Sequence, residues 1–258
     1  SLFEFAHAPK EKREKILSLL PPNHTIEVDV QFPDDLTEEQ KKICSKIIAA
    51  PDYFLLWGPP GTGKTSKMLH HIVRYLLENT NEKLLLMAYT NRAVDEMCEA
   101  IESIHADVRS QYLRIGSRYG VRTEYQPQLL DTLASGCKTR QELLDMLSQQ
   151  RIVLGTVASL QGKPELFNLI HFDRLLVDEA SQIIEPSLAG FMTRFEKVLL
   201  IGDHLQLPAV VTQDKSSTIV KNQELKNIGL KDLRDSLFER LYLRCQAMGW
   251  DWAYARLS

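Results

Sequence analysis

The chain has 258 residues, of which 44% are hydrophobic and 25% are charged, and its formal net charge is −3. This composition is typical of a globular protein with a sizeable core. No run approaches the roughly 18 apolar residues of a membrane span, and the N-terminus lacks the pattern of a signal peptide, so we expect an intracellular protein: cytosolic or nuclear, or cytoplasmic in a bacterium. The net charge provides no overall attraction to phosphate backbones, so any nucleic-acid contact requires a local surface.

The four cysteines are spread widely along the chain, at Cys44, Cys98, Cys137 and Cys245. None belongs to a CxxC pair, so the spacing favours neither a zinc site nor a disulfide framework. We interpret them as reduced residues that mostly pack in the core.

Two helices are predicted first in chain order, over residues 10–20, where Pro21 ends the helix, and over residues 37–50. Short apolar runs follow, and because they are continuous rather than alternating they indicate parallel strands covered by helices on both faces. They lie at residues 54–57, 84–88, 152–154, 175–177 and 198–201. The predicted fold class is therefore α/β, with ligands expected beyond the carboxyl ends of the strands.

The segment 103–150 is too long for a plain connection and is predicted to be a small accessory insertion, with a strand at 112–115 and a helix at 140–149. The main domain would then comprise residues 36–102 and 151–258, after an N-terminal helical or linker segment, 1–35. Part of the insertion is basic and contains no acidic residue from position 109 to 123. A strand-binding surface and a solvated basic face both remain open for it. Its arginines are Arg109, Arg114, Arg118 and Arg122, and three of them lie close to Tyr112 or Tyr119.

A glycine-rich segment between the first predicted strand and a helical stretch that runs to about Glu78 fits the P-loop pattern. It reads Gly58-Pro59-Pro60-Gly61-Thr62-Gly63-Lys64-Thr65 and is followed by Ser66. Backbone N–H groups of such a loop wrap a phosphate at a helix N-terminus. Lys64 is predicted to reach the β- and γ-phosphates and the Thr65 hydroxyl to bind Mg²⁺, so ATP with Mg²⁺ is the expected cofactor.

Two adjacent carboxylates follow the predicted strand 175–177, at Asp178 and Glu179. Asp178 is expected to hold the Mg²⁺ through water, while Glu179 orients and deprotonates the attacking water. Such a pair alone is also compatible with a helix cap. Combined with a P-loop in the same sheet, it predicts an ATP-hydrolysing site.

Several further segments occur in a fixed order around the P-loop, and together they resemble superfamily 1 helicases. The resemblance covers about residues 36–241 and is to the 5′-to-3′ branch that includes the nonsense-mediated-decay helicase and the nuclease-helicase of Okazaki fragment processing. It implies a RecA-like parallel sheet sandwiched by helices, the first of two motor domains. The segments are Leu36-Thr37-Glu38-Glu39-Gln40, Ala88-Tyr89-Thr90-Asn91-Arg92-Ala93-Val94-Asp95, Gly155-Thr156-Val157-Ala158-Ser159-Leu160, Val177-Asp178-Glu179-Ala180-Ser181-Gln182 and Gly202-Asp203-His204-Leu205-Gln206-Leu207-Pro208.

The resemblance implies a role for each of these segments. Gln40 is assigned to the adenine edge, although Thr37 and Gln40 also fit a capping box. Thr90 and Asn91 are assigned to the nucleic-acid backbone, and so are Thr156 and Ser159. For these positions a helix N-cap or an ordinary strand-to-helix turn remains an alternative.

The segment that begins at Gly202 follows the last predicted strand and is expected to place Asp203 and Gln206 near the γ-phosphate. Gln206 is the predicted sensor, because an uncharged amide can bond the γ-phosphate or the attacking water and relax when phosphate leaves. Such a contact links the nucleotide state to a loop that touches the strand or the second domain.

The expected function is that of an ATP-binding motor domain of a helicase that acts on single-stranded nucleic acid, with DNA favoured over RNA. Motifs of a second RecA-like domain are missing, and the chain starts at Ser1 and stops at Ser258, so we expect a piece of a larger protein. Without the arginine of a second domain, hydrolysis is expected to be slower by about three to five orders of magnitude. The alternatives are an RNA helicase of the same branch, an ATPase switch that does not unwind, and a module that binds ATP only to hold a complex together.

Overall fold

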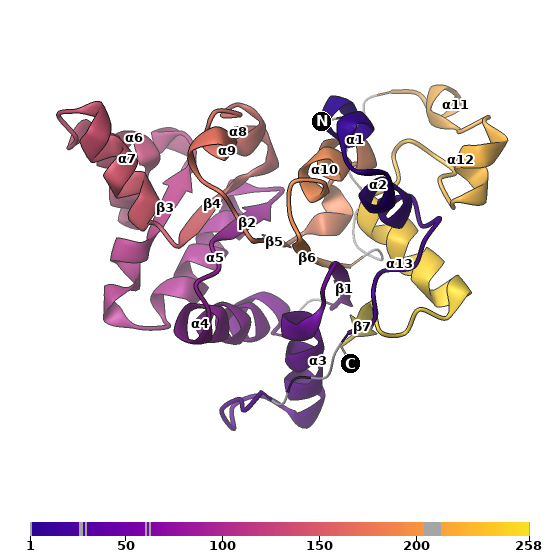
Figure 1. The fold of residues 1–258 in the computed structure, drawn as a ribbon, viewed down its shortest axis with the longest axis horizontal. Coiled ribbons are helices and arrows are strands. Elements are labelled where there is room, and N and C mark those ends of the chain that lie inside the picture. Colours follow the sequence, from indigo (N-terminus) through magenta and orange to yellow (C-terminus); the bar gives the residue numbers. More distant parts are fainter. Residues whose placement is uncertain are drawn as a thin grey trace. The chain divides into compact units, whose positions relative to one another are not determined.

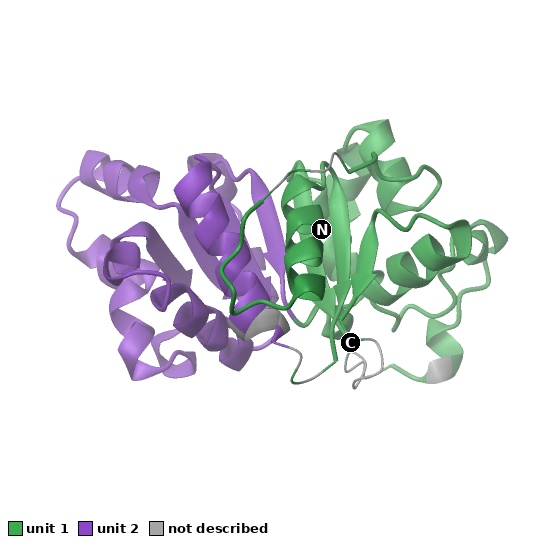
Figure 2. Cartoon of the chain, turned by 90° about the horizontal axis from the view of Figure 1, so that it is seen from below, with its two compact units in different colours: residues 1–62, 179–258 green, residues 63–178 purple. Residues whose placement is uncertain are grey.

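The computed structural model of the chain describes residues 2–25, 28, 30–59, 61, 63–203 and 213–257, with the backbone alone for 64–66 and 215. The chain divides into two compact units, which are coloured separately in Figure 2. Unit 1 comprises residues 1–62 and 179–258, and unit 2 comprises residues 63–178. The chain therefore passes between the units once within the P-loop and once between Asp178 and Glu179.

Unit 2 contains four parallel strands in the order β3-β4-β2-β5. Every residue in these strands is buried, as expected for strands covered on both faces. Leu86 in the middle of β2 is paired with Leu154 on one side and Leu176 on the other. The strands are β2 (Leu84–Ala88), β3 (Tyr112–Ile115), β4 (Ile152–Thr156) and β5 (Arg174–Val177).

The helices of unit 2 cover both faces of these strands. Figure 1 shows α4 (His70–Asn79) and α5 (Asn91–Glu102) on one side, and α8 (Val157–Gln161) and α9 (Leu166–Leu169) on the other. A π-helix, η1 (Lys64–Leu69), leads from the P-loop into α4. The remaining helical segments are η2 (Ala106–Gln111), η3 (Arg118–Gly120), η4 (Thr123–Gln128), α6 (Leu130–Ser135) and α7 (Arg140–Gln149).

Unit 1 contains three parallel strands, with β1 (Tyr53–Trp57) between β6 (Lys197–Gly202) and β7 (Tyr254–Arg256). The last residue of β6 has to be glycine because a Cβ at Gly202 would lie 2.8 Å from the Phe238 ring. That close approach packs α13 (Leu237–Met248) directly onto the end of the strand. The other helices are α1 (Leu2–His7), α2 (Lys10–Ile16), α3 (Glu38–Ala49), η5 (Ala180–Gln182), α10 (Glu185–Met192), α11 (Lys215–Thr218) and α12 (Gln223–Asn227).

All five predicted strands are confirmed, as are the strand at 112–115 and the helix at 140–149 within the segment predicted to be an insertion. The first predicted helix is shorter than expected and ends at Ile16, before the prolines. The strand β7 was not predicted. Within the described ranges, every helix is too short or too polar to cross a lipid bilayer.

Candidate nucleotide and nucleic-acid sites

The P-loop begins where β1 ends, and the glycines at its two ends, Gly58 and Gly63, form backbone hydrogen bonds. The Gly58 N–H donates to the Gly202 carbonyl of β6 at 3.1 Å. Gly61 and Gly63 have φ angles of +80° and +75°, a left-handed conformation that favours glycine. The Gly63 carbonyl then accepts from the N–H groups of Lys67 and Met68 at 2.9 and 3.0 Å, which starts the helical segment.

Left-handed glycines followed directly by a helical segment are features of a phosphate-binding loop. Of the predicted P-loop contacts, Gly58, Pro59, Gly61 and Gly63 are described. Pro60 and Thr62 lie outside the described residues. For Lys64, Thr65 and Ser66, which open η1, only the backbone is described.

The predicted acidic pair follows β5 directly, and its two members differ in burial and backbone conformation. Asp178 is 3% exposed, and its N–H donates to the Met87 carbonyl of β2 at 2.8 Å. Glu179 is half-buried and has a φ of 53°, which is uncommon for a residue other than glycine. Unfavourable backbone of this kind persists where the surrounding structure imposes it, often at functional sites.

The acidic pair also allows a test of whether the chain fits a magnesium ion. Mg²⁺ prefers hard oxygen ligands such as carboxylates. Asp178 provides such a carboxylate at the carboxyl end of β5. Across the described parts of the chain, no three His, Cys, Asp or Glu side chains are grouped to hold a metal. Mg²⁺ usually keeps several waters and binds one or two carboxylates together with substrate phosphates, a donor set that Asp178 fits.

In unit 1 a buried hydrogen-bond chain links Asp203 to two other segments of the predicted ATP site. The Trp57 indole N–H, at the end of β1, donates to Asp203 Oδ1 at 2.9 Å. The Asp203 N–H lies 3.3 Å from the Ser181 hydroxyl, two residues after Glu179. The Arg256 guanidinium stacks on the Trp57 ring at 4.0 Å. Gln206, the predicted sensor, lies outside the described residues.

Trp57 and Ser181 are the residues of this site that sequence reasoning missed. A tryptophan that ends a buried strand next to a P-loop is the signal that was available, because its buried indole N–H requires an acceptor. Nothing in the sequence identifies the acceptor as Asp203, 146 positions later.

Gln40, predicted to bind adenine, forms the alternative capping box at the start of α3. The Thr37 hydroxyl accepts from the Gln40 N–H at 3.2 Å, and Gln40 Oε1 accepts from the Thr37 N–H at 3.0 Å. Its amide oxygen is therefore engaged in the cap, and the adenine contact stays a prediction.

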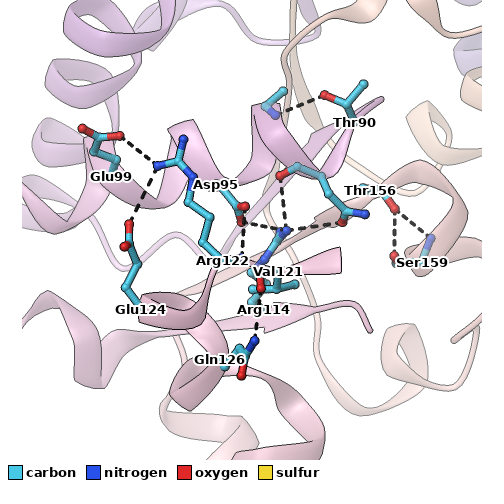
Figure 3. Close-up of polar contacts among 12 residues, drawn as sticks. Thr90, Asp95, Glu99, Arg114, Val121, Arg122, Glu124, Gln126, Thr156 and Ser159 are labelled. Carbon is cyan, nitrogen blue, oxygen red and sulfur yellow. Dashed lines mark hydrogen bonds and ion pairs between the residues drawn. The ribbon is translucent and has the colours of Figure 1, made fainter. Parts of the chain in front are cut away.

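Thr90, which Figure 3 labels, lies where β2 ends and α5 begins, and Asn91 is the first residue of α5. Thr90 is the N-cap of α5, and its hydroxyl accepts from the Ala93 N–H at 3.1 Å. Asn91 is exposed. Arg114 Nη2 of β3 donates to the Asn91 carbonyl at 3.3 Å and to its Oδ1 at 3.4 Å. The Thr90 cap is therefore present. The Asn91 side chain, which is predicted to contact nucleic acid, is held in place by a hydrogen bond from Arg114.

Arg114 is fully buried and paired with Asp95, one turn along α5, at 2.9 Å. Burial raises the pKa of the Asp95 carboxyl, and the Arg114 charge and the Arg122 N–H oppose that rise. Asp95 Oδ2 accepts this Arg122 N–H at 3.3 Å, as Figure 3 shows. The same carboxylate thus ties α5 to β3 and to the segment after it.

Thr156 and Ser159 form the corresponding cap at the start of α8. Thr156 Oγ1 accepts from the Ser159 N–H at 3.1 Å, and the two hydroxyl oxygens lie 2.7 Å apart (Figure 3). Thr156 is 6% exposed, and Ser159 is half-buried. The strand-to-helix turn is therefore confirmed, and their contact with nucleic acid remains a prediction.

The structure distinguishes the arginines of the basic stretch. Arg109 is paired with Glu102 at 2.6 Å, and Arg122 lies 3.6 Å from Glu99 and 3.8 Å from Glu124. Arg114 is buried. Arg118 bonds only a neutral amide among the described residues, with its Nε donating to Gln126 Oε1 at 3.1 Å. Carboxylates therefore pair with three of the four arginines of this basic stretch, and only Arg118 has no carboxylate partner among the described residues.

Parallel strands with a glycine loop after β1 and acids after β5 define an α/β P-loop NTPase. The chain belongs to the AAA domain family, which it matches over residues 35–140 and 128–214. It is 33% identical over 176 residues to the DNA replication ATP-dependent helicase/nuclease JHS1 of Arabidopsis thaliana, covering 68% of this chain and 12% of that relative. It is 32% identical over 218 residues to dna2 of Schizosaccharomyces pombe, which has the same description, and that match covers 81% of this chain and 14% of the relative.

The human protein of the same description is 28% identical over 252 residues, covering 93% of this chain and 22% of the relative. The chain therefore spans less than a quarter of the length of these relatives. The predicted α/β P-loop fold and the resemblance to superfamily 1 helicases of the Okazaki nuclease-helicase type are confirmed.

Proposed function

We propose that this chain is the ATP-binding first motor domain of an ATP-dependent helicase that moves 5′ to 3′ on single-stranded DNA. The observation that carries the proposal is the pair of left-handed glycines, Gly61 and Gly63, between β1 and a helical segment, together with Asp178 and Glu179 after β5. The names of the relatives support DNA over RNA. A second RecA-like domain would complete both the ATP site and the nucleic-acid groove.

Each residue has one task in this proposal. The loop from Gly58 to Gly63 wraps the phosphates, and its backbone N–H groups come from Gly61 onward, because Pro59 and Pro60 have none and the Gly58 N–H is bonded to Gly202. Lys64 neutralises the β- and γ-phosphates. Thr65 and Asp178 would hold Mg²⁺, which supplies charge neutralisation at the phosphates. Glu179 takes the proton of the attacking water. Gln206 reports the loss of the γ-phosphate.

The nucleic-acid side of the proposal uses the ends of β2 and β4. Asn91 contributes an amide to the strand backbone beside Thr90, and Ser159 contributes a hydroxyl beside Thr156. Such neutral groups contact phosphate and sugar without reading sequence. ATP hydrolysis by the intact protein is therefore expected to rise when mixed-sequence single strands are added, and a switch that does not bind DNA would show no rise.

Two substitutions separate ATP binding from hydrolysis in the intact protein. Lys64→Ala should abolish productive ATP binding, because the phosphates lose their cation. Glu179→Gln should retain bound ATP and lower turnover by about 100-fold or more, because the general base is gone. A fluorescent ATP analogue measures binding, and phosphate release measures turnover.

Lys67→Ala is the matched control, since Lys67 is an exposed lysine three residues further along η1. It should leave both measurements near those of the unchanged protein. Near-normal turnover in both Lys64→Ala and Glu179→Gln would contradict the assigned roles.

A further inference from the structure

Tyr119 presents a whole aromatic ring to solvent beside the segment assigned to the nucleic-acid backbone. Its side chain is 100% exposed, whereas Tyr112 and Tyr125 in the same segment are buried. The next residue, Gly120, lies against Asn91, since a Cβ there would be 2.7 Å from Asn91 Nδ2. Tyr119 is therefore one residue away from a direct contact with Asn91.

The turn that carries Tyr119 is held firmly on two sides. Gln126 Nε2 donates to the carbonyls of Arg118 and Val121 at 3.1 and 3.3 Å, so one side chain spans both ends of the turn. Just after it, the Arg122 N–H is bonded to buried Asp95. A ring on a braced turn loses little conformational entropy when it binds a partner.

The charge beside Tyr119 suits a polyanion. Arg118, its neighbour, is exposed, and its only bonding partner in the described chain is the neutral amide of Gln126. The arginines on either side of it in sequence are each paired with a carboxylate, Arg114 with Asp95 and Arg122 with Glu99 and Glu124. Arg118 thus retains a positive charge that no described carboxylate neutralises.

We propose that Tyr119 is a stacking platform for one base of a single nucleic-acid strand and that Arg118 contacts an adjacent phosphate. The proposal rests on the nucleic-acid binding proposed above and adds a base contact to it. Aromatic stacking tolerates any base, because every base has a π-face, and a single basic side chain adds affinity without reading sequence. The proposed path of the nucleic-acid strand therefore continues from Asn91 to the turn η3, in the segment between α5 and β4.

The test measures the binding of fluorescent oligothymidylate to the intact protein by anisotropy over a series of salt concentrations. Tyr119→Ala should weaken binding by about 10-fold to 100-fold, whereas Tyr119→Phe and Tyr119→Trp should bind nearly normally. Arg118→Gln should reduce the slope of log affinity against log salt by about 0.7, the value for one phosphate of a single strand. Phe3→Ala removes another exposed ring, 72% exposed on α1, and should change neither measurement.

An oligonucleotide with abasic sites throughout separates stacking from a structural effect. The unchanged protein and Tyr119→Ala should bind it equally, because it offers no base to stack. If Tyr119→Ala binds oligothymidylate as tightly as the unchanged protein, or loses affinity for the abasic strand as well, the stacking role is wrong. Failure of the unchanged intact protein to bind either strand would instead contradict the proposed nucleic-acid function on which the inference rests.

Discussion

At the scale of single residues, Glu179 has an energetically unfavourable backbone conformation, which its proposed chemical role would explain. A left-handed φ of 53° costs a residue with a Cβ about 1 kcal/mol or more. Asparagine adopts that conformation more readily. A residue whose side chain type disfavours its own backbone conformation is expected where the side chain performs chemistry, since function often opposes stability at such sites.

Glu179→Asn is therefore expected to raise the free energy of unfolding by about 0.5–1 kcal/mol, because asparagine relieves the backbone cost. Glu179→Gln retains that cost and should lie within about 0.5 kcal/mol of the unchanged chain. Both variants should lose hydrolysis. Urea unfolding followed by circular dichroism measures the difference, and an Asn variant no more stable than the Gln variant would contradict the strain argument.

At the scale of elements, Arg240 of α13 joins segments of unit 1 that lie far apart in sequence. Its guanidinium forms two bonds to the Glu185 carboxylate of α10, at 2.7 and 2.8 Å. It also donates to the Ile16 carbonyl at 2.8 Å and to the Ser18 hydroxyl at 3.2 Å. Arg240 is 3% exposed and Glu185 is 9% exposed, so neither charge is well solvated. The end of α2 is thereby fixed to α10 and α13.

Arg240→Ala is expected to lower the free energy of unfolding by about 3–5 kcal/mol, because it leaves the Glu185 charge buried and unpaired. The double variant Arg240→Met/Glu185→Leu should be much more stable than Arg240→Ala, because it contains no unpaired buried charge. Arg74→Ala is the control, because the pair of Arg74 with Glu78 is exposed and should contribute about 0.5 kcal/mol. A loss for Arg240→Ala no larger than the control value would show that the buried pair does not hold α2 in place.

The elements also show which information the sequence contains. Continuous apolar runs predicted β1, β2, β4, β5 and β6, because burial on both faces leaves that pattern. Strand β7 has only three residues, none of them buried, so it leaves no such pattern. Its place depends on pairing with β1, almost 200 positions earlier.

The site residues divide in the same way. Glycines with positive φ and acids after a strand are local features, and the sequence located them. Arg114 appeared to belong to a basic surface, yet it is buried, because a carboxylate 19 positions earlier neutralises it. The available signal was Asp95 itself, a charge on the apolar face of α5 between Val94 and Met97, since a buried carboxylate requires a cation.

At the scale of the whole molecule, the cysteines report on the packing of both units. Cys44 and Cys245 are fully buried in unit 1, and Cys98 is fully buried in unit 2. Burial raises the pKa of the Cys44 and Cys98 thiols to about 12 and that of Cys245 to about 11. Cys137, on the loop between α6 and α7, is only half-buried. The prediction that most cysteines pack in the core fits this distribution.

One thiol per chain is therefore expected to react rapidly with Ellman's reagent at pH 8 in the native state, and all four in denaturant. The thiolate is the reactive form, and at pH 8 the buried thiols are almost entirely protonated as well as covered. Cys137→Ser should remove the rapid phase. The buried thiols should then react only as fast as their unit opens, so the slow phases measure the local stability of each unit. Two or more rapid equivalents in the native chain would mean that at least one unit opens too readily to protect its buried thiols.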